Sequence, residues 1–430
     1  MRLRRWLDVC CALILWLAPF APWASAATAT EVPVGISLEQ AVVEALAGNP
    51  SLAVERREVD IAKGIRRQAG IYPFNPELEA EGGAGRSRDR VDPDERRGVN
   101  AKSVGLSQTI WLQGQRGLRM RAADAGLLRA RRVVQDAERQ IVADVLKAYG
   151  DLLVSQERLG LARQILGVVQ QVRATAQSLF EADAVPELEV FRADVEVRKA
   201  ENRVVSEERG LATTRRELAL LIGRAVGEPL RAVAPSPALP RPAGDLETLG
   251  GQALVGRPDL NAALAAVDAA TAEVDLVRAE RFLPEIKVGV KYEEAREFDS
   301  TSQRGLLTLS VPLPLWNRRD GDLDRARAEV AKQQAQVELT RRRIEKEISV
   351  ARQQVDASSQ IVDRYVRSIL PQQERNFGLL REAYAIGEIR ITDVFVGQRE
   401  FIESREAYLE AVSIFNAAAA DLYRALDARP

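Results

Sequence analysis

The 430-residue sequence contains no histidine, and its two cysteines, Cys10 and Cys11, lie at the extreme N-terminus. Histidine-dependent catalysis and imidazole-ligated zinc or copper sites are therefore excluded. Beyond residue 11 the chain has no cysteine for a disulfide or an iron–sulfur cluster. We find no nucleophile–base pair, phosphate loop or metal-ligand cluster, so we expect neither an enzyme nor a cofactor. The net charge of −1 gives no electrostatic reason to expect a nucleic-acid partner.

Long apolar runs are also missing, except for a short one near the N-terminus. Three arginines in the first five residues precede the apolar run Val9–Ala18, and Ala24-Ser25-Ala26 forms a small-residue cleavage site. We therefore predict that residues 1–26 are a cleaved signal peptide and that the protein is exported. A transmembrane anchor is the alternative, but the run is too short and prolines interrupt it. No cysteine follows the cleavage site, so we expect no lipid anchor, and any membrane span must be built from strands.

The sequence from residue 27 to 430 consists of two related halves. A shift of 208 residues aligns Pro50-Ser51-Leu52 with Pro258-Asp259-Leu260, and a shift of 204 aligns Phe180 with Tyr384. The offset changes only at expected loops, as a diverged duplication predicts. We therefore expect one protomer made of repeats 37–222 and 245–428, joined by a proline-rich linker at 223–244.

Each repeat begins with helical sequence, predicted at 38–47 and 51–70 in the first repeat. The period then changes to strict alternation, with Ile286, Val288 and Val290 separated by lysine or glycine. This pattern predicts two strands per repeat, each with one apolar and one polar face. We place the two hairpins, which have highly charged connections, at about 77–110 and 285–313.

A very long helix follows each hairpin. Residues 113–179 contain no proline, and their apolar residues recur with 4-3-4-3 spacing from Ile141 to Leu166. Such a heptad seam predicts a helix of about 100 Å. The second copy contains Pro371, which we expect to kink it. A return helix is predicted at 187–222, and the two shorter helices of each repeat should stack end to end beside the long one.

Four amphipathic strands cannot close a membrane barrel alone, because open sheet edges are not tolerated in lipid. Three chains give twelve strands and twelve columns of helix, enough to close a tube. The predicted fold is therefore mostly α with a small β part. It is a trimeric 12-stranded transmembrane β-barrel, with four strands per chain, continued by a 12-helix periplasmic α-barrel. The alternative from the pattern alone is a soluble periplasmic coiled-coil structural protein with small hairpins.

The whole exported chain resembles the TolC-like outer-membrane factor family, the exit ducts of tripartite efflux pumps and type I secretion systems. The residues that carry this resemblance are Ser37-Leu38-Glu39-Gln40-Ala41, Asn49-Pro50-Ser51-Leu52, its copy Arg257-Pro258-Asp259-Leu260, and Tyr384-Ala385-Ile386-Gly387-Glu388-Ile389 before Asp393-Val394. Within the family, Ser310-Val311-Pro312-Leu313-Pro314-Leu315-Trp316-Asn317-Arg318 resembles the cobalt-zinc-cadmium heavy-metal branch. The resemblance implies a homotrimer in the outer membrane that extends into the periplasm. It also implies two partners, a periplasmic adaptor protein and an inner-membrane proton-driven transporter of the RND type.

The resemblance also assigns roles to the two turns between long and return helices, at about 180–187 and 384–393. The second turn corresponds to the family's periplasmic aperture, and its candidate residues are Tyr384, Gly387, Arg390 and Asp393. Three copies of Asp393 around a threefold axis would form a cation-selective ring. The equal alternative is that Asp393 only caps the return helix. The first turn, with Phe180, Asp183 and Pro186, is the candidate docking tip for the adaptor, and a plain turn is the alternative.

The polar face of the strands is the candidate barrel lumen, with outer-membrane lipid against the apolar face. Its candidate residues are Glu77, Glu79, Glu81, Lys287, Lys291 and Glu293. The glutamates would favour cations, although any porin-like lumen is polar. Trp111 and Trp316 are placed at the ends of strands, as membrane-interface aromatics.

These observations predict a passive channel subunit. Its function would be the trimeric exit duct of a tripartite efflux system, carrying divalent heavy-metal cations out of the periplasm. An exit duct for drugs or for a type I secretion substrate is the alternative. A carboxylate-only site does not suit soft metals, so selection of the metal is expected elsewhere in the pump.

Overall fold

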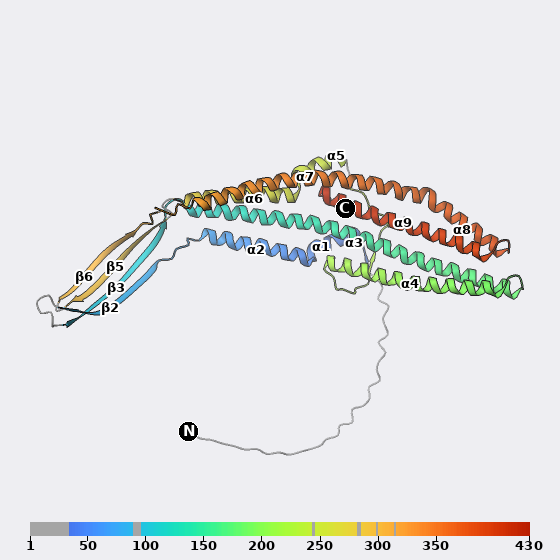
Figure 1. The fold of residues 1–430 in the computed structure, drawn as a ribbon, viewed down its shortest axis with the longest axis horizontal. Helices are drawn as coiled ribbons and strands as arrows, with labels where there is room; N and C mark the ends of the chain where they lie inside the picture. The colour runs from blue at the N-terminus through green and yellow to red at the C-terminus, as the bar shows by residue number, and fades with distance from the viewer. Residues whose placement is uncertain (1–33, 89–95, 243–245, 282–284, 298–299, 314) are drawn as a thin grey trace, which may run out of the picture.

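The computed structural model describes residues 34–88, 96–242, 246–281, 285–297, 300–313 and 315–430. The expected signal peptide lies outside the described residues, as do parts of the linker and of the charged hairpin connections. The protein is elongated and mostly helical, with a small sheet at one end (Figure 1). Among the described residues, no helix is long and apolar enough to cross a membrane.

The first half contains the helices, the hairpin and the long helix at nearly the predicted positions. Its elements are β1 (Val34–Ile36), α1 (Leu38–Gly48), α2 (Pro50–Gly70), β2 (Glu77–Arg88), β3 (Arg96–Trp111), α3 (Gln115–Glu181) and α4 (Glu187–Ile222). Ser37 begins α1 with a capping box, in which its hydroxyl accepts from the Gln40 N–H and the Gln40 side chain accepts from the Ser37 N–H. Gly223, at φ +76°, ends α4 in the left-handed region that favours glycine.

The second half repeats this order with one difference. Its elements are β4 (Leu230–Ala232), α5 (Leu246–Gly256), α6 (Pro258–Ala279), β5 (Glu285–Glu297), β6 (Ser300–Ser310), α7 (Asp320–Arg364), the π-helical turn η1 (Tyr365–Ile369), α8 (Leu370–Ala385) and α9 (Ile391–Leu426). The expected disturbance at Pro371 takes the form of η1, directly before it. Pro371 has no N–H for the carbonyl one turn earlier and its ring crowds that carbonyl, so a wider turn relieves the clash.

The shorter helices stack end to end beside α3, with α2 and α4 meeting at α1 (Figure 1). Asn49 makes this junction, since its Nδ2 donates to the Leu221 carbonyl at 2.8 Å while its Oδ1 caps α2. A Cβ on Gly223 would run into the Gly48 carbonyl, so only glycine fits there. In the second half Arg257 takes the place of Asn49, and its guanidinium donates to the Ala425 carbonyl at 3.3 Å.

The linker contains structure that the sequence did not predict. Residues 230–232 form β4, which pairs in parallel with β1. The buried Tyr149 of α3 secures this small sheet, because its hydroxyl donates to the Val233 carbonyl at 2.9 Å and accepts from the Val233 N–H at 3.1 Å. Strands of three residues carry too little alternation to be recognised, and their pairing joins segments far apart in sequence.

The heptad positions form the helical core. In α3 the buried members are Ile141, Val145, Ala148, Leu152, Leu159 and Ala162, and in α7 they are Ile344, Ala351, Val355 and Ser358. Buried clusters continue along the length of the helices down to the tips. The long helices therefore form one continuous scaffold that fixes the sheet at one end and the two tips at the other.

Candidate functional site: the sheet and the helical tips

The four main strands form one antiparallel sheet in the order β2-β3-β5-β6. One row across its apolar face contains Leu78, Leu106, Val290 and Leu307, aligned by the strand register. These side chains are 73%, 50%, 55% and 85% exposed. Among the described residues, the outer edges of β2 and β6 pair with no other strand. Exposed leucine and valine on a face with open edges indicate a surface that is covered in the working protein.

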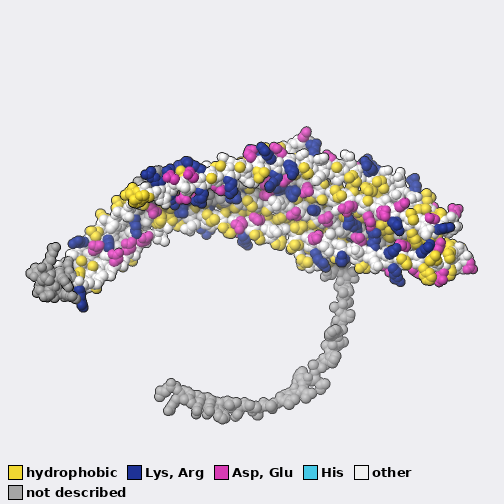
Figure 2. Space-filling view, viewed as in Figure 1, with side chains coloured by type: hydrophobic (Ala, Val, Ile, Leu, Met, Phe, Trp, Pro, Cys, Tyr) yellow, Lys and Arg dark blue, Asp and Glu magenta, His cyan; other side chains and the backbone are white. Residues whose placement is uncertain are grey.

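The opposite face carries all six residues predicted for the lumen, and they form ion pairs. Lys287 Nζ lies 2.7 Å from Glu77 Oε2 and 3.0 Å from Glu79 Oε1. Lys291 Nζ lies 2.8 Å from Glu81 Oε2 and 3.3 Å from Glu293 Oε1. Acidic and basic side chains lie together on the part of the sheet seen in Figure 2. Four carboxylates thus meet two ammonium groups, so this set keeps a net charge of −2 per chain.

The two predicted interface tryptophans differ from one another. Trp111 ends β3 as expected, and its ring packs 5.5 Å from Tyr72 and 5.6 Å from Phe74, with the Arg119 guanidinium 5.3 Å from its centre. Trp316 does not end a strand, because β6 stops at Ser310. Pro312 has no N–H to continue the ladder, which accounts for the shorter strand. The second hairpin therefore ends three residues earlier than the sequence predicted.

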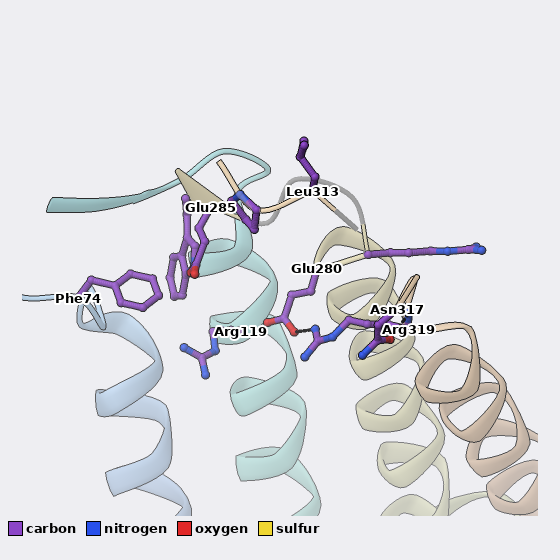
Figure 3. A pocket seen from close by; sticks show the side chains of 10 residues that line it. Phe74, Arg119, Glu280, Glu285, Leu313, Asn317 and Arg319 are labelled. Atoms are coloured by element: carbon purple, nitrogen blue, oxygen red, sulfur yellow. Dashed lines mark hydrogen bonds and ion pairs between the residues drawn. The ribbon is translucent and has the colours of Figure 1, made fainter. Parts of the chain in front are cut away.

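A cavity of about 450 Å³ lies where the sheet meets the helices (Figure 3). Phe74 and Arg119 line one side of it. On the other side Arg319 donates to Glu280 at 2.5 Å. Leu313 also borders the cavity, but in Figure 3 its side chain extends away from these charged groups. Two of the charges that line this cavity, those of Arg319 and Glu280, are therefore paired within the chain.

The second tip joins α8 to α9 with a tight turn. Gly387, at φ +79°, donates its N–H to the Tyr384 carbonyl at 2.9 Å. Tyr384 is buried in the tip core, whereas Arg390 and Asp393 are exposed. Asp393 Oδ2 accepts from the Arg390 N–H at 3.2 Å, so this carboxylate does cap the return helix. The same carboxylate is also exposed to solvent.

The first tip has the same backbone geometry. Asp183 takes the place of Gly387 with φ +56°, and its N–H donates to the Phe180 carbonyl at 2.9 Å. Asp183 and Pro186 are exposed, whereas the half-buried Phe180 packs against the tip core. Pro186 is the N-cap of α4 and not a residue of its first turn.

Sequence reasoning missed a residue that joins the two tips. The Tyr384 hydroxyl donates to Glu189 Oε2 of α4 at 3.3 Å. Burial raises the pKa of Tyr384 well above its usual range, and the negative charge of Glu189 raises it further. The hydroxyl therefore remains a donor at every physiological pH. The 204-residue shift aligns Glu189 with Asp393, and that alignment was the available signal.

The comparison with protein families decides what this scaffold is. The model of the family described as "Outer membrane efflux protein" matches residues 41–224 and 249–428. The chain belongs to this family. Its members are transport proteins and not enzymes, and they act as trimeric channels in tripartite efflux systems. The family also gives the location, the outer membrane with an extension into the periplasm, which removes the soluble structural protein as an alternative.

Individual relatives agree with this assignment. The chain is 25% identical to the cobalt-zinc-cadmium resistance protein CzcC of Cupriavidus metallidurans over 375 residues, which cover 87% of this chain and 86% of that protein. Among solved structures, CusC has a TM-score of 0.73 at 20% identity, covering 91% of this chain and 92% of its own. VceC of Vibrio cholerae has a TM-score of 0.71 at 20% identity, covering 91% and 96%. These structures support the fold.

Proposed function

We propose that three copies of this chain form the exit duct of a tripartite efflux system that releases divalent heavy-metal cations. The observation that carries this proposal is the division of the sheet into an exposed apolar face and an ion-paired polar face. Only a closed sheet with lipid outside and water inside satisfies both faces and both open edges. The β6 edge of one chain would pair with the β2 edge of the next, giving twelve strands above twelve helical columns.

The charge on the polar face supports cations as the transported solutes. The six ion-paired residues on this face contribute a net charge of −2 per chain, hence −6 in a trimer. The lysines hold the carboxylates in place, so the wall attracts cations without chelating one tightly. The relative CzcC is named for cobalt, zinc and cadmium resistance, which favours heavy metals for this chain also.

The tips supply the proposed gate and the proposed docking surface. The aperture would be formed by Tyr384, Gly387, Arg390 and Asp393, with the Tyr384–Glu189 hydrogen bond holding the two tips of one chain together at rest. A periplasmic adaptor would contact Asp183 and Pro186, while Phe180 supports the turn from beneath. An inner-membrane proton-driven transporter of the RND type would then supply the energy that this passive subunit lacks.

A deletion strain and planar bilayers test this function. Loss of the gene should sensitise cells to cobalt, zinc or cadmium, and the purified trimer should conduct cations in preference to anions. A strain with unchanged metal tolerance but new drug sensitivity would assign the duct to drugs. A detergent-solubilised protein that light scattering shows to be monomeric would contradict the trimer itself.

A further inference from the structure

The alternating apolar sequence of β6 continues beyond the end of the strand. Alternate residues Leu307 and Leu309 lie in the strand, and the alternation goes on through Val311, Leu313 and Leu315 after the ladder has ended. Leu313 is 69% exposed, Leu315 60% and Trp316 91%. We call these three residues the junction knuckle. Such an exposed apolar cluster at the junction of sheet and helices needs a partner.

The matching residue of the first repeat shows that this exposure is not a general property of the junction. A shift of 205 residues aligns Trp111 with Trp316. Trp111 is covered by Tyr72, Phe74 and Arg119 of its own chain, as described above. Nothing among the described residues covers Trp316 in this way. Each chain thus has one packed tryptophan, Trp111, and one exposed tryptophan, Trp316, after the corresponding hairpins.

Basic side chains directly follow the knuckle. The Asn317 side chain accepts from the Arg319 N–H at 3.0 Å, and Arg319 at φ +56° turns the chain into α7. Arg319 is held by Glu280, whereas the exposed Arg318 has no ion pair with any described residue. Figure 2 shows a hydrophobic patch beside lysine and arginine side chains where the sheet meets the helices. Along the chain, the apolar residues are therefore followed by Trp316 and then by Arg318, a cation without an ion pair to any described residue.

We infer that the junction knuckle and Arg318 bind anionic phospholipids of the periplasmic leaflet of the outer membrane. The leucines would enter the acyl region that the apolar face already contacts, and Trp316 would sit at the headgroup boundary, where its amphipathic ring is favoured. Arg318 would pair with lipid phosphate, which suits a guanidinium. This inference rests on the proposed function, since it requires the sheet to stand in the outer membrane.

Fluorescence of Trp316 tests the inference, because only Trp111 and Trp316 lie outside the first 26 residues. In the Trp111→Phe variant, Trp316 is the single tryptophan beyond residue 26, and selective excitation of tryptophan reports on it alone. We would reconstitute the trimer in vesicles of phosphatidylcholine and phosphatidylglycerol, with bromine on one lipid class at a time. Brominated phosphatidylglycerol should quench Trp316 with a preference of about fivefold over brominated phosphatidylcholine, the value expected for one basic side chain.

Two further variants separate the headgroup contact from general charge. Adding Arg318→Gln should bring the preference close to one, while leaving quenching by total brominated lipid unchanged. Arg367→Gln removes another exposed arginine, which lies in η1 far along the helices from the sheet, and should leave the preference intact. If Trp111→Phe fails to give a trimer, the difference between the natural protein and Trp316→Phe isolates the same signal.

Three results would overturn the inference. If neither brominated lipid nor aqueous acrylamide quenches Trp316, its side chain lies against a neighbouring chain. If acrylamide quenches Trp316 freely, its side chain lies in water. If both brominated lipid classes quench Trp316 equally in the Trp111→Phe variant, Arg318 has no role in selecting the lipid. In all three cases the trimer is inserted, so the proposed duct stands. A protein that does not enter vesicles or form a trimer would refute the duct as well.

Discussion

Glu189 and Asp393 are the third residues of equivalent return helices, yet they accept hydrogen bonds from different donors. Asp393 accepts from the N–H of its own N-cap residue, Arg390, at 3.2 Å. Glu189 has no such donor, because its N-cap residue is Pro186. Its carboxylate turns instead to the Tyr384 hydroxyl of the other tip. One proline thus converts a local cap into a link between the two repeats.

This link predicts how the aperture responds to mutation. Tyr384→Phe removes the donor and should raise the resting conductance of the trimer in planar bilayers. Pro186→Ala should raise it less, because the new N–H only competes for Glu189. The charged partner makes the bond worth roughly 1.5–3 kcal/mol in a single chain. Phe180→Tyr changes the equivalent residue of the first tip and serves as the control. Unchanged conductance in Tyr384→Phe would show that the link does not hold the aperture.

The closest backbone approach in the helical stack predicts a large loss of stability. Gly223→Ala should destabilise the protein well beyond the cost of a left-handed residue, since its Cβ would meet the Gly48 carbonyl. Gly114→Ala is the matched control, because Gly114 has φ +67° with nothing near its Cβ position. The control should lose about 1–2 kcal/mol. Urea unfolding followed by circular dichroism measures both, and equal losses would contradict the packing argument.

The buried guanidinium of Arg257 predicts a second loss of stability. Its side chain is 1% exposed and pairs with Asp259 at 2.6 Å and Glu347 at 2.8 Å. Arg257→Ala leaves both carboxylates without this partner, which should cost about 3–5 kcal/mol. Arg198→Ala, at an exposed pair with Glu201, should cost less than about 1 kcal/mol. The same unfolding measurement applies, and a small loss in Arg257→Ala would argue for water entering the site.

Asp259 makes the stability that this ion pair contributes depend on pH in the acid range. Burial alone would raise the pKa of Asp259, but the hydrogen bond and charge of Arg257 outweigh it, so the pKa lies below its ordinary value. Because the carboxyl pKa is lower in the folded protein, the group contributes stability at any pH above its unfolded pKa, near 3.9. This contribution is lost as the pH falls through the folded pKa. The stability difference between the natural protein and Asp259→Asn should therefore be constant near neutral pH and shrink below about pH 4.

Two buried tyrosines and one half-buried tyrosine predict that the protein loses stability at alkaline pH. Burial raises the pKa values of Tyr149, Tyr408 and Tyr423 in the folded protein. These groups contribute their full stability at any pH below the unfolded tyrosine pKa of about 10, and the contribution is lost as the pH rises above that pKa. Each such group should contribute a loss of up to about 1.4 kcal/mol per pH unit in that window. Tyr423→Phe should make the fall between pH 10 and pH 11 shallower, and an unchanged slope would contradict this account.

Substitution of the lysines on the polar face predicts a change in ion selectivity. The double variant Lys287→Gln, Lys291→Gln removes two positive charges per chain and should increase the cation-to-anion permeability ratio. Glu77→Gln, Glu79→Gln should decrease it. Reversal potentials in a salt gradient measure both, with Arg198→Gln on α4 as the control. Equal permeability ratios in the natural protein and in both double variants would place the selective step elsewhere in the channel.

The sequence by itself determined the elements of the fold. The heptad spacing along α3 and the alternation along β5 each require one continuous apolar face, because side-chain direction follows the local period. Prolines and glycines at the element ends fixed most boundaries to within a few residues. Alternation also placed the six residues predicted for the lumen on one polar face.

Only the tertiary structure decided how distant residues meet. The Glu189–Tyr384 bond spans 195 residues, Lys287 pairs with Glu77 across 210, and β1 pairs with β4 through three residues each. Trp111 and Trp316 occupy equivalent places in the sequence, yet one is packed and the other is exposed. Such differences depend on helix packing and strand register, and a local pattern carries no information about which distant residue will lie opposite.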